Sequence, residues 1–471
     1  EREREREERL RTTAGPWSVA RSSKEKKDTE STPPQKKKKK TPPPPPPPKK
    51  KKKRSPPPGE RMTHGAGNAE GPVCVNASQY EQGARVLLPE MVYGYYRGGA
   101  DSEGTLQRNR DAWARRGAPL WPRCCVDVSH CDTATHILGK AVRSPVMVAP
   151  TAMQEMCHLR VDKEGNLVHV PPSGGFSGEC AMARAALSQG SAFCLSSLAT
   201  HSIEEVAAAC ARHDPAEAAP RWFQLYVFRD RSIAADLVQR AADAGFDAIC
   251  VTVDAPVFGK REEDLRSGMH LPLGLSLENF RKYIVPRSEL EKDSASAGKS
   301  GISEFVDAQF DSSLQWDDIE ELVKTSPLPI VVKGIMRGEE AVEAARRGCA
   351  GVVVSNHGGR QLDNAPSTCE VLPEVVSCLR AHPEFQSVEI FVDGGVRRGT
   401  DVVKALAMGA QGVLVGRPCL WALCVEGEAG VENVLRILQE EVKIALCLLG
   451  CPSIRHLDSS CLWSGAPTAK L

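Results

Sequence analysis

The sequence lacks the features that mark several special classes of protein. It has no run of about 18 or more consecutive apolar residues, so no membrane-spanning helix is expected. Its 17 cysteines form no paired Cys-x-x-Cys set, and no apolar signal segment stands near residue 1. We therefore expect neither a metal-binding module nor a secreted disulfide scaffold, but reduced thiols in an intracellular compartment.

The net charge is also small, at +1, so nothing in the overall balance calls for nucleic acid or an acidic membrane as a partner. The charge is unevenly spread, because residues 1–61 combine a Glu-Arg alternation with runs of lysine and proline. Such a segment buries too little apolar surface to offset its ordering entropy, and we expect it to be disordered. It is either sequence translated in error upstream of Met62 or a passive tail, with a nuclear-import or polyanion-binding tail as the alternative.

From residue 145 onward, short β-branched segments alternate with amphipathic segments rich in Ala, Glu and Arg. This alternation is typical of βα units around a parallel sheet, and eight such units predict a (β/α)8 barrel. Ser202, followed three residues later by Glu205, has the pattern of a helix capping box. The expected strands are 145–149, 192–196, 222–227, 248–253, 329–333, 351–355, 389–393 and 412–416, and the helices between them include 202–212, 233–244, 339–347 and 400–408.

Two segments interrupt the regular spacing of the barrel domain, which we place at residues 72–465. The connection 257–316 is far longer than the two to six residues usual in such folds, and we expect it to form an active-site lid. Residues 159–177 separate the first strand from its helix and carry no recognisable motif. They are either a solvent-exposed insertion or the product of retained intron sequence.

The sequence Ser-Asn-His-Gly-Gly-Arg-Gln-Leu-Asp at residues 355–363 directly follows an expected buried strand. It delivers a base, His357, and a fixed cation, Arg360, to the strand's C-terminal end, where barrels of this kind carry their chemistry. The imidazole titrates near neutral pH, and the guanidinium matches a carboxylate. The pair indicates removal of a proton next to an anchored acid.

Two glycine-rich turns follow the last two strands, at residues 393–399 and 416–418. Glycines let backbone N–H groups approach phosphate oxygens closely, while Arg397 and Arg417 supply positive charge. The loops after strands seven and eight are the usual phosphate site of (β/α)8 barrels. The sequence therefore predicts a phosphorylated ligand.

Taken together, these motifs resemble the FMN-dependent L-2-hydroxy-acid oxidase family, which includes glycolate oxidase and lactate oxidase. The resemblance covers about residues 75–465 apart from the insertion, and it draws on all eight expected strands. The matching stretches are 91–96, 149–153, 224–226, 252–254, 260–262, 332–334, 355–363 and 393–401.

The resemblance implies a role for each matching residue. His357 would take a proton from the substrate, and Asp254 would orient its ring and favour its protonated form. Arg261 and Arg360 would clamp the substrate carboxylate. Tyr95 would contact the same carboxylate, and Tyr226 the substrate hydroxyl.

The resemblance also implies FMN as the cofactor. Lys333 would lie beside the flavin N1 and O2 atoms, where a cation stabilises negative charge on the reduced ring. The isoalloxazine and ribityl contacts would come from Pro150, Thr151, Ala152, Ser196, Gln224, Thr252 and Ser355, and the phosphate would be held by Asp393, Gly394, Gly395, Arg397, Gly416 and Arg417.

One departure from the family bears on specificity. Members that act on glycolate usually carry Trp where this chain has Leu198. A smaller side chain widens the pocket and weakens contact with a two-carbon acid, because apolar contact scales with buried area. A longer aliphatic 2-hydroxy acid is therefore expected.

The last three residues, Ala469, Lys470 and Leu471, are a variant of the Ser-Lys-Leu peroxisomal address. An oxidase that makes hydrogen peroxide has a reason to carry such an address. We expect the tail 466–471 to engage the peroxisomal import receptor and to place the protein in the peroxisome.

The expected activity is that of an (S)-2-hydroxy-acid oxidase, EC 1.1.3.15-like, which converts its substrate to a 2-oxo acid and reduces dioxygen to hydrogen peroxide. The family resemblance suggests a homotetramer. Three alternatives stay open: a dehydrogenase with another electron acceptor, an inactive barrel kept as a binding protein, and a relative of inosine-monophosphate dehydrogenase. The last shares the Asp-Gly-Gly turn but gives no reason for Arg261, His357 and Arg360.

Overall fold

The computed structural model describes residues 74–463 except 117, 173–174, 212–218, 273 and 284–308. The expected disordered segment 1–61, the middle of the expected lid 257–316 and the tail 466–471 lie outside the described residues. No helix in the described part of the chain is both long enough and apolar enough to cross a membrane.

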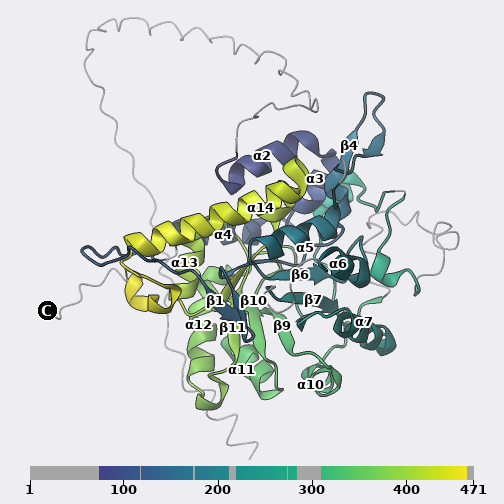
Figure 1. The fold of residues 1–471 in the computed structure, drawn as a ribbon. Helices are drawn as coiled ribbons and strands as arrows, with labels where there is room; N and C mark the ends of the chain where they lie inside the picture. The colour runs from purple at the N-terminus through teal and green to yellow at the C-terminus, as the bar shows by residue number, and fades with distance from the viewer. Residues whose placement is uncertain are drawn as a thin grey trace, which may run out of the picture. The chain divides into compact units, whose positions relative to one another are not determined.

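Eight parallel strands close into a barrel, as the sequence predicts (Figure 1). Neighbouring strands pair in chain order, and the last strand pairs with the first to complete the circle. Most strand residues are buried, since helices cover the outer face and side chains fill the interior. The barrel strands are β3 (Val146–Val148), β6 (Phe193–Ser196), β7 (Arg221–Tyr226), β8 (Ala248–Thr252), β9 (Ile330–Ile335), β10 (Gly351–Val354), β11 (Glu389–Val392) and β12 (Gly412–Val415).

Helices follow the strands and form the outer layer. The expected capping box at Ser202 is present, and this helix ends at Ala209, three residues before the expected end. The longest helix is kinked at Gly427, whose φ is 62°. The outer helices are α5 (Gly178–Ser188), α6 (Ile203–Ala209), α7 (Arg231–Asp243), α10 (Trp316–Thr325), α11 (Gly338–Arg346), α12 (Thr368–Arg380), α13 (Gly399–Ala407) and α14 (Arg417–Leu448), and short helices are α8 (Glu262–Ser267), η3 (Glu278–Phe280) and η4 (Pro383–Phe385).

Elements outside the βα repeat complete the domain. The N-terminal helix α2 lies along α14 in Figure 1, and the two are joined by a hydrogen bond from Tyr80 Oη to Glu426. A hairpin of β1 and β2 contacts the start of β11, where Leu138 N donates to Glu389, so it lies at the N-terminal end of the barrel. The remaining elements are α2 (Ala77–Leu87), α3 (Glu90–Arg97), α4 (Gly104–Asp111), η1 (Ala112–Arg116), β1 (Thr135–Ile137), β2 (Lys140–Val142), η2 (Gln154–His158), β4 (Leu159–Val161), β5 (Leu167–His169), η5 (Ile454–His456) and η6 (Ser459–Cys461).

The insertion 159–177 is an ordered part of this domain where the structure describes it. Strands β4 and β5 form an antiparallel hairpin with Leu159 opposite His169. The hairpin projects from the body of the domain in Figure 1. Most of its described residues are exposed or half-buried, as a solvent-exposed insertion would be.

Candidate active site

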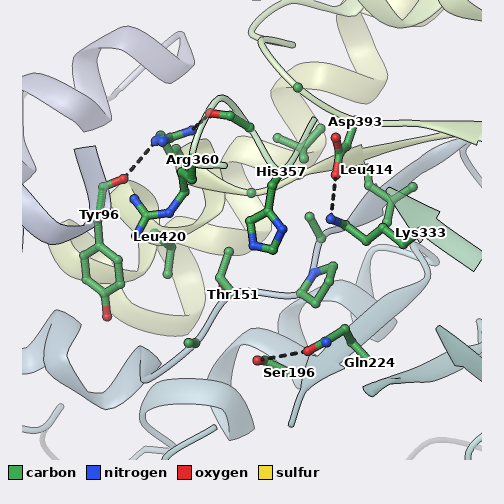
Figure 2. Close-up of a pocket in the computed structure, with 18 of the residues that line it drawn as sticks. Tyr96, Thr151, Ser196, Gln224, Lys333, His357, Arg360, Asp393, Leu414 and Leu420 are labelled. Carbon is green, nitrogen blue, oxygen red and sulfur yellow. Dashed lines mark hydrogen bonds and ion pairs between the residues drawn. The ribbon is translucent and has the colours of Figure 1, made fainter. Parts of the chain in front are cut away.

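A cavity of about 980 Å³, including its open mouth, lies at the C-terminal ends of the barrel strands (Figure 2). This is the end at which barrels of this fold hold their active sites. Nearly all the residues expected from the sequence line it. They are Tyr95, Pro150, Thr151, Ala152, Ser196, Leu198, Gln224, Tyr226, Thr252, Arg261, Lys333, His357, Arg360, Asp393, Gly394, Gly395, Arg397, Gly416 and Arg417.

Two expected residues, Asp254 and Ser355, do not line the cavity themselves but contact residues that do. Asp254 Oδ1 lies 2.9 Å from His357 Nδ1, and Ser355 Oγ accepts hydrogen bonds from the His357 backbone N–H and from Lys333 Nζ. Since Asp254 occupies Nδ1, the opposite ring nitrogen, Nε2, is left to face the cavity, where Figure 2 shows the imidazole. The structure thus joins a base to an orienting carboxylate 103 residues away along the chain.

Local backbone geometry makes this pair possible. His357 has a left-handed φ of 57°, which turns the chain sharply at the end of β10. Gly334 follows Lys333 with a φ of 114°, and a Cβ placed on it would lie 2.7 Å from Asp254 Cβ. Only glycine at position 334 leaves room for the Asp254 side chain in this position.

Burial sets the protonation of the pair. Burial lowers the pKa of His357 below its ordinary value, and this effect exceeds the opposite effect of Asp254. Burial by itself would raise the pKa of Asp254, but His357 and Lys333 together lower it. Asp254 does raise the pKa of His357, as expected from the sequence, but burial lowers that pKa by more. The free site therefore holds an ionised Asp254 and a neutral His357, as a proton acceptor requires.

Lys333 stands on the floor of the cavity, inside the barrel. Its Nζ donates to Ser355 Oγ at 3.1 Å and lies 3.5 Å from Asp393 Oδ2. Although burial opposes the charged form, the carboxylates of Asp393 and Asp254 raise the pKa of Lys333 above its ordinary value. A permanent buried cation is thus held at one fixed place.

Four arginines add further positive charge to the cavity wall. Burial lowers the pKa of Arg261 to about 10, and the like charge of Arg360 adds to this effect. Burial likewise lowers the pKa of Arg397 to about 10 and that of Arg417 well below its ordinary value. The guanidinium groups of Arg360, Arg397 and Arg417 donate hydrogen bonds to backbone carbonyl groups.

This excess of partly buried cations calls for anionic ligands. Among the described residues, the only carboxylate in ion-pair range of these four arginines is Asp264, whose Oδ2 lies 3.9 Å from Arg261 Nη1. Burying a charge without a counter-charge is unfavourable, so a bound anion would relieve the cost. The arrangement suits two anionic groups, one near Arg261 and Arg360 and one near Arg397 and Arg417.

A row of polar side chains lines the opposite part of the cavity. Ser196 and Gln224 are register partners on β6 and β7, and Ser196 Oγ lies 3.3 Å from Gln224 Oε1. Gln224 Nε2 in turn donates to Thr252 Oγ1 at 3.0 Å. These contacts fix the amide and leave a line of donors and acceptors across three strands, which suits a planar polar ligand.

The sequence reasoning missed several apolar and aromatic wall residues. Phe258 lines the cavity and lies under the Arg261 guanidinium, whose central carbon is 4.3 Å from the Phe258 ring centroid. Outside the lining, Phe310, from the far end of the long connection, stacks on the cavity residue Tyr226 with ring centroids 4.4 Å apart. The other missed residues that line the cavity are Tyr96, Ala149, Gly358, Val396, Leu414, Val415 and Leu420. Tyr96, Ala149, Gly358 and Val396 stood within stretches already singled out, and Leu414 and Val415 within an expected strand, whereas no motif in the sequence marked Phe258 or Leu420.

Comparisons with known proteins agree with this geometry. Residues 84–464 match the family model of the FMN-dependent dehydrogenases. The chain is 43% identical over 391 residues to L-lactate oxidase from Nostoc sp., covering 82% of this chain and 98% of that protein. It is 42% identical over 391 residues to 2-hydroxyacid oxidase 1 from Homo sapiens, covering 82% and 95%. A crystal structure of mandelate oxidase with (S)-4-hydroxymandelic acid superposes with a TM-score of 0.70 at 37% identity, covering 81% of this chain and 97% of that one.

Proposed function

The chain belongs to the family of FMN-dependent 2-hydroxy-acid oxidases, and we propose that it oxidises an (S)-2-hydroxy acid to the 2-oxo acid while dioxygen is reduced to hydrogen peroxide. The observation that carries this proposal is the His357–Asp254 pair in a cavity that also holds Arg261 and Arg360. A base beside two guanidinium groups suits the removal of a proton from an anchored carboxylic acid.

The cavity fits FMN, which supplies a two-electron acceptor when it is bound. The guanidinium groups of Arg397 and Arg417 form no ion pair with a carboxylate of the described residues, so they can take a phosphate beside the Gly394–Gly395 turn. The Ser196, Gln224 and Thr252 row and the buried Lys333 would meet the polar edge of the ring system, with Pro150, Thr151 and Ala152 beside it.

The protein's own residues then divide the work. Arg261 and Arg360 bind the substrate carboxylate, and this contact fixes the α-carbon next to His357. His357 accepts a proton at Nε2, and Asp254 holds the ring through Nδ1 and stabilises the imidazolium that forms. Tyr95, whose ring lies 5.0 Å from the Arg360 guanidinium, and Tyr226 complete the substrate wall.

Purified protein tests the proposal directly. A yellow preparation that is bleached by a 2-hydroxy acid without oxygen, and that regains its colour with release of hydrogen peroxide when air is admitted, supports an oxidase. Bleaching without peroxide release on re-aeration would indicate a dehydrogenase with another acceptor. A colourless protein that takes up no added FMN would indicate a binding protein.

The preferred substrate is proposed to be longer than two carbons. Leu198 lines the cavity and is buried, so its small side chain leaves room beside the substrate. The fold tolerates a larger acid in at least one relative, a mandelate oxidase with bound (S)-4-hydroxymandelic acid.

Leu198→Trp is expected to shift specificity toward the two-carbon acid. The indole fills space that a longer chain would use, and one methylene in an apolar pocket changes kcat/KM by roughly 10- to 200-fold. Steady-state kcat/KM over a chain-length series measures the shift. Leu362→Trp, on a side chain 76% exposed outside the cavity, is the matched control. An unchanged preference in Leu198→Trp would contradict the assignment.

Two further proposals concern the cell and the assembly. The terminal Ala469-Lys470-Leu471 supports import into the peroxisome, and a fluorescent fusion that loses peroxisomal location without these residues would bear this out. We also propose that the protein forms a homotetramer. Light scattering tests this by measuring the molecular mass in solution.

A further inference from the structure

The hairpin of residues 159–177 is tied closely to the domain at both ends. His158 Nε2 accepts a hydrogen bond from Gly178 N at 3.2 Å, and His158 O accepts one from Val170 N at 2.9 Å. Burial lowers the pKa of His158 to about 4, so its ring is neutral and can accept. The insertion therefore leaves and rejoins the domain at one point, and its ends meet as those of a compact surface loop do.

One side chain of the hairpin reaches back into the domain. His169, at the end of β5, places Nε2 at 2.6 Å from Oε1 of Glu155, a residue of η2 that is only 5% exposed. Among the described residues, Glu155 Oε2 has no hydrogen-bond partner, and His201 Nε2 is 3.9 Å from it. His169 is thus the nearest ring-nitrogen partner of a buried carboxylate.

Glu155 belongs to the segment that forms one wall of the cavity. The preceding residue, Gln154, donates from Nε2 to Thr151 Oγ1 at 2.9 Å, and Thr151 lines the cavity. Glu155 N donates to Thr200 Oγ1 at 3.1 Å. The position of η2 therefore sets the position of residues 150–152, which line the cavity and would contact the flavin.

A second carboxylate holds the same segment from the other side. Glu179, fully buried, accepts from Gln154 N at 2.8 Å and from Thr200 N at 2.9 Å, and lies 2.9 Å from His201 Nδ1. Burial would raise the pKa of Glu179, but His201 and the backbone donors lower it, so the carboxylate is ionised. No group of His, Cys, Asp and Glu in the described part of the chain is arranged to hold a metal ion.

We infer that the β4–β5 hairpin, residues 159–169, is a working part of the cofactor site, in which His169 is a positioning residue that holds the flavin-contacting segment 150–152 through Glu155. The inference requires only that FMN binds, so it does not depend on the proposed substrate or on dioxygen as acceptor. It also gives the insertion a role that its sequence, without a motif, did not reveal.

Two variants of nearly equal chemistry test the inference. His169→Gln places an amide nitrogen where Nε2 stands and keeps a donor within reach of Glu155, whereas the amide of His169→Asn is one carbon too short. The apoprotein of each is titrated with FMN, and the quenching of flavin fluorescence gives Kd. We expect His169→Asn to raise Kd about tenfold, the effect of leaving a buried carboxylate oxygen without its hydrogen-bond donor. His169→Gln should stay within about threefold of the wild type, since it retains the hydrogen bond.

Controls separate positioning from general destabilisation. Leu167→Ala removes a side chain that is 42% exposed on the same strand and should leave Kd unchanged. Adding Glu155→Gln to His169→Asn should raise Kd little further, because both changes remove the same contact between His169 and Glu155. Equal Kd values for wild type and His169→Asn overturn the inference, as does a Kd for His169→Gln that is raised as much as that of His169→Asn. Failure of the wild type to bind FMN would instead count against the cofactor itself.

Discussion

His357→Gln is expected to lower turnover of the 2-hydroxy acid by about 10²- to 10⁴-fold, the usual contribution of a positioned general base. Glutamine can form hydrogen bonds but cannot accept a proton at neutral pH. Because His357 lines the cavity without being part of the phosphate turns, the variant should still bind FMN. Stopped-flow mixing with substrate under anaerobic conditions measures the rate of flavin bleaching directly.

The matched control is His270→Gln. His270 is exposed, and its Nδ1 lies 2.9 Å from the nearby Gly268 carbonyl oxygen, so the same change there should leave the rate unaltered. The flavin absorbance of His357→Gln reports whether the cofactor is retained. Turnover close to that of the wild type in a flavin-loaded His357→Gln would refute the assignment of His357 as the base.

The second large effect is expected for Asp254→Asn, which should reduce kcat by about 10²- to 10⁴-fold, as happens when an orienting carboxylate is replaced beside a catalytic histidine. The Asp254 carboxylate accepts a hydrogen bond from the Nδ1–H group of His357, which leaves the lone pair of Nε2 pointing toward the cavity. An asparagine can donate to Nδ1 instead, and this stabilises the tautomer whose Nε2 already carries a proton. The side chain also loses the negative charge that stabilises the imidazolium.

The pH profile distinguishes this electrostatic effect from a loss of structure. In the wild type the base must be neutral, so kcat/KM falls as the pH drops through the His357 pKa, which lies below its ordinary value of about 6.5 because of burial. Asp254 raises that pKa, so the asparagine variant should have a still lower one. The acid limb of the profile is therefore expected to move to lower pH while the plateau falls. An acid limb that moves to higher pH would contradict the role of Asp254.

Much of the architecture follows from local sequence patterns. All eight barrel strands lie within one or two residues of their expected positions, since buried β-branched runs between amphipathic helices encode parallel strands locally. The carboxyl ends of parallel strands meet on one face, so residues such as Lys333, His357 and Arg397 could be assigned to one site from their places after strands.

Other features could not be predicted because they depend on contacts between distant segments. The stacking of Phe310 on Tyr226 joins the end of the long connection to β7, and no local pattern announces it. The insertion shows the same limit, because a hairpin without a motif acquires a meaning only when His169 meets Glu155.

The sequence by itself predicted the barrel, since strand period and residue type are local properties, and its resemblance to a known family implied FMN and the candidate base and cations. Tertiary structure alone decided how those groups behave. Packing buries His357 enough to lower its pKa, holds Asp254 at 2.9 Å from it and brings the hairpin against the cavity wall. Proton affinity depends on the dielectric surroundings and charges that folding assembles, and these come from parts of the chain far apart in sequence.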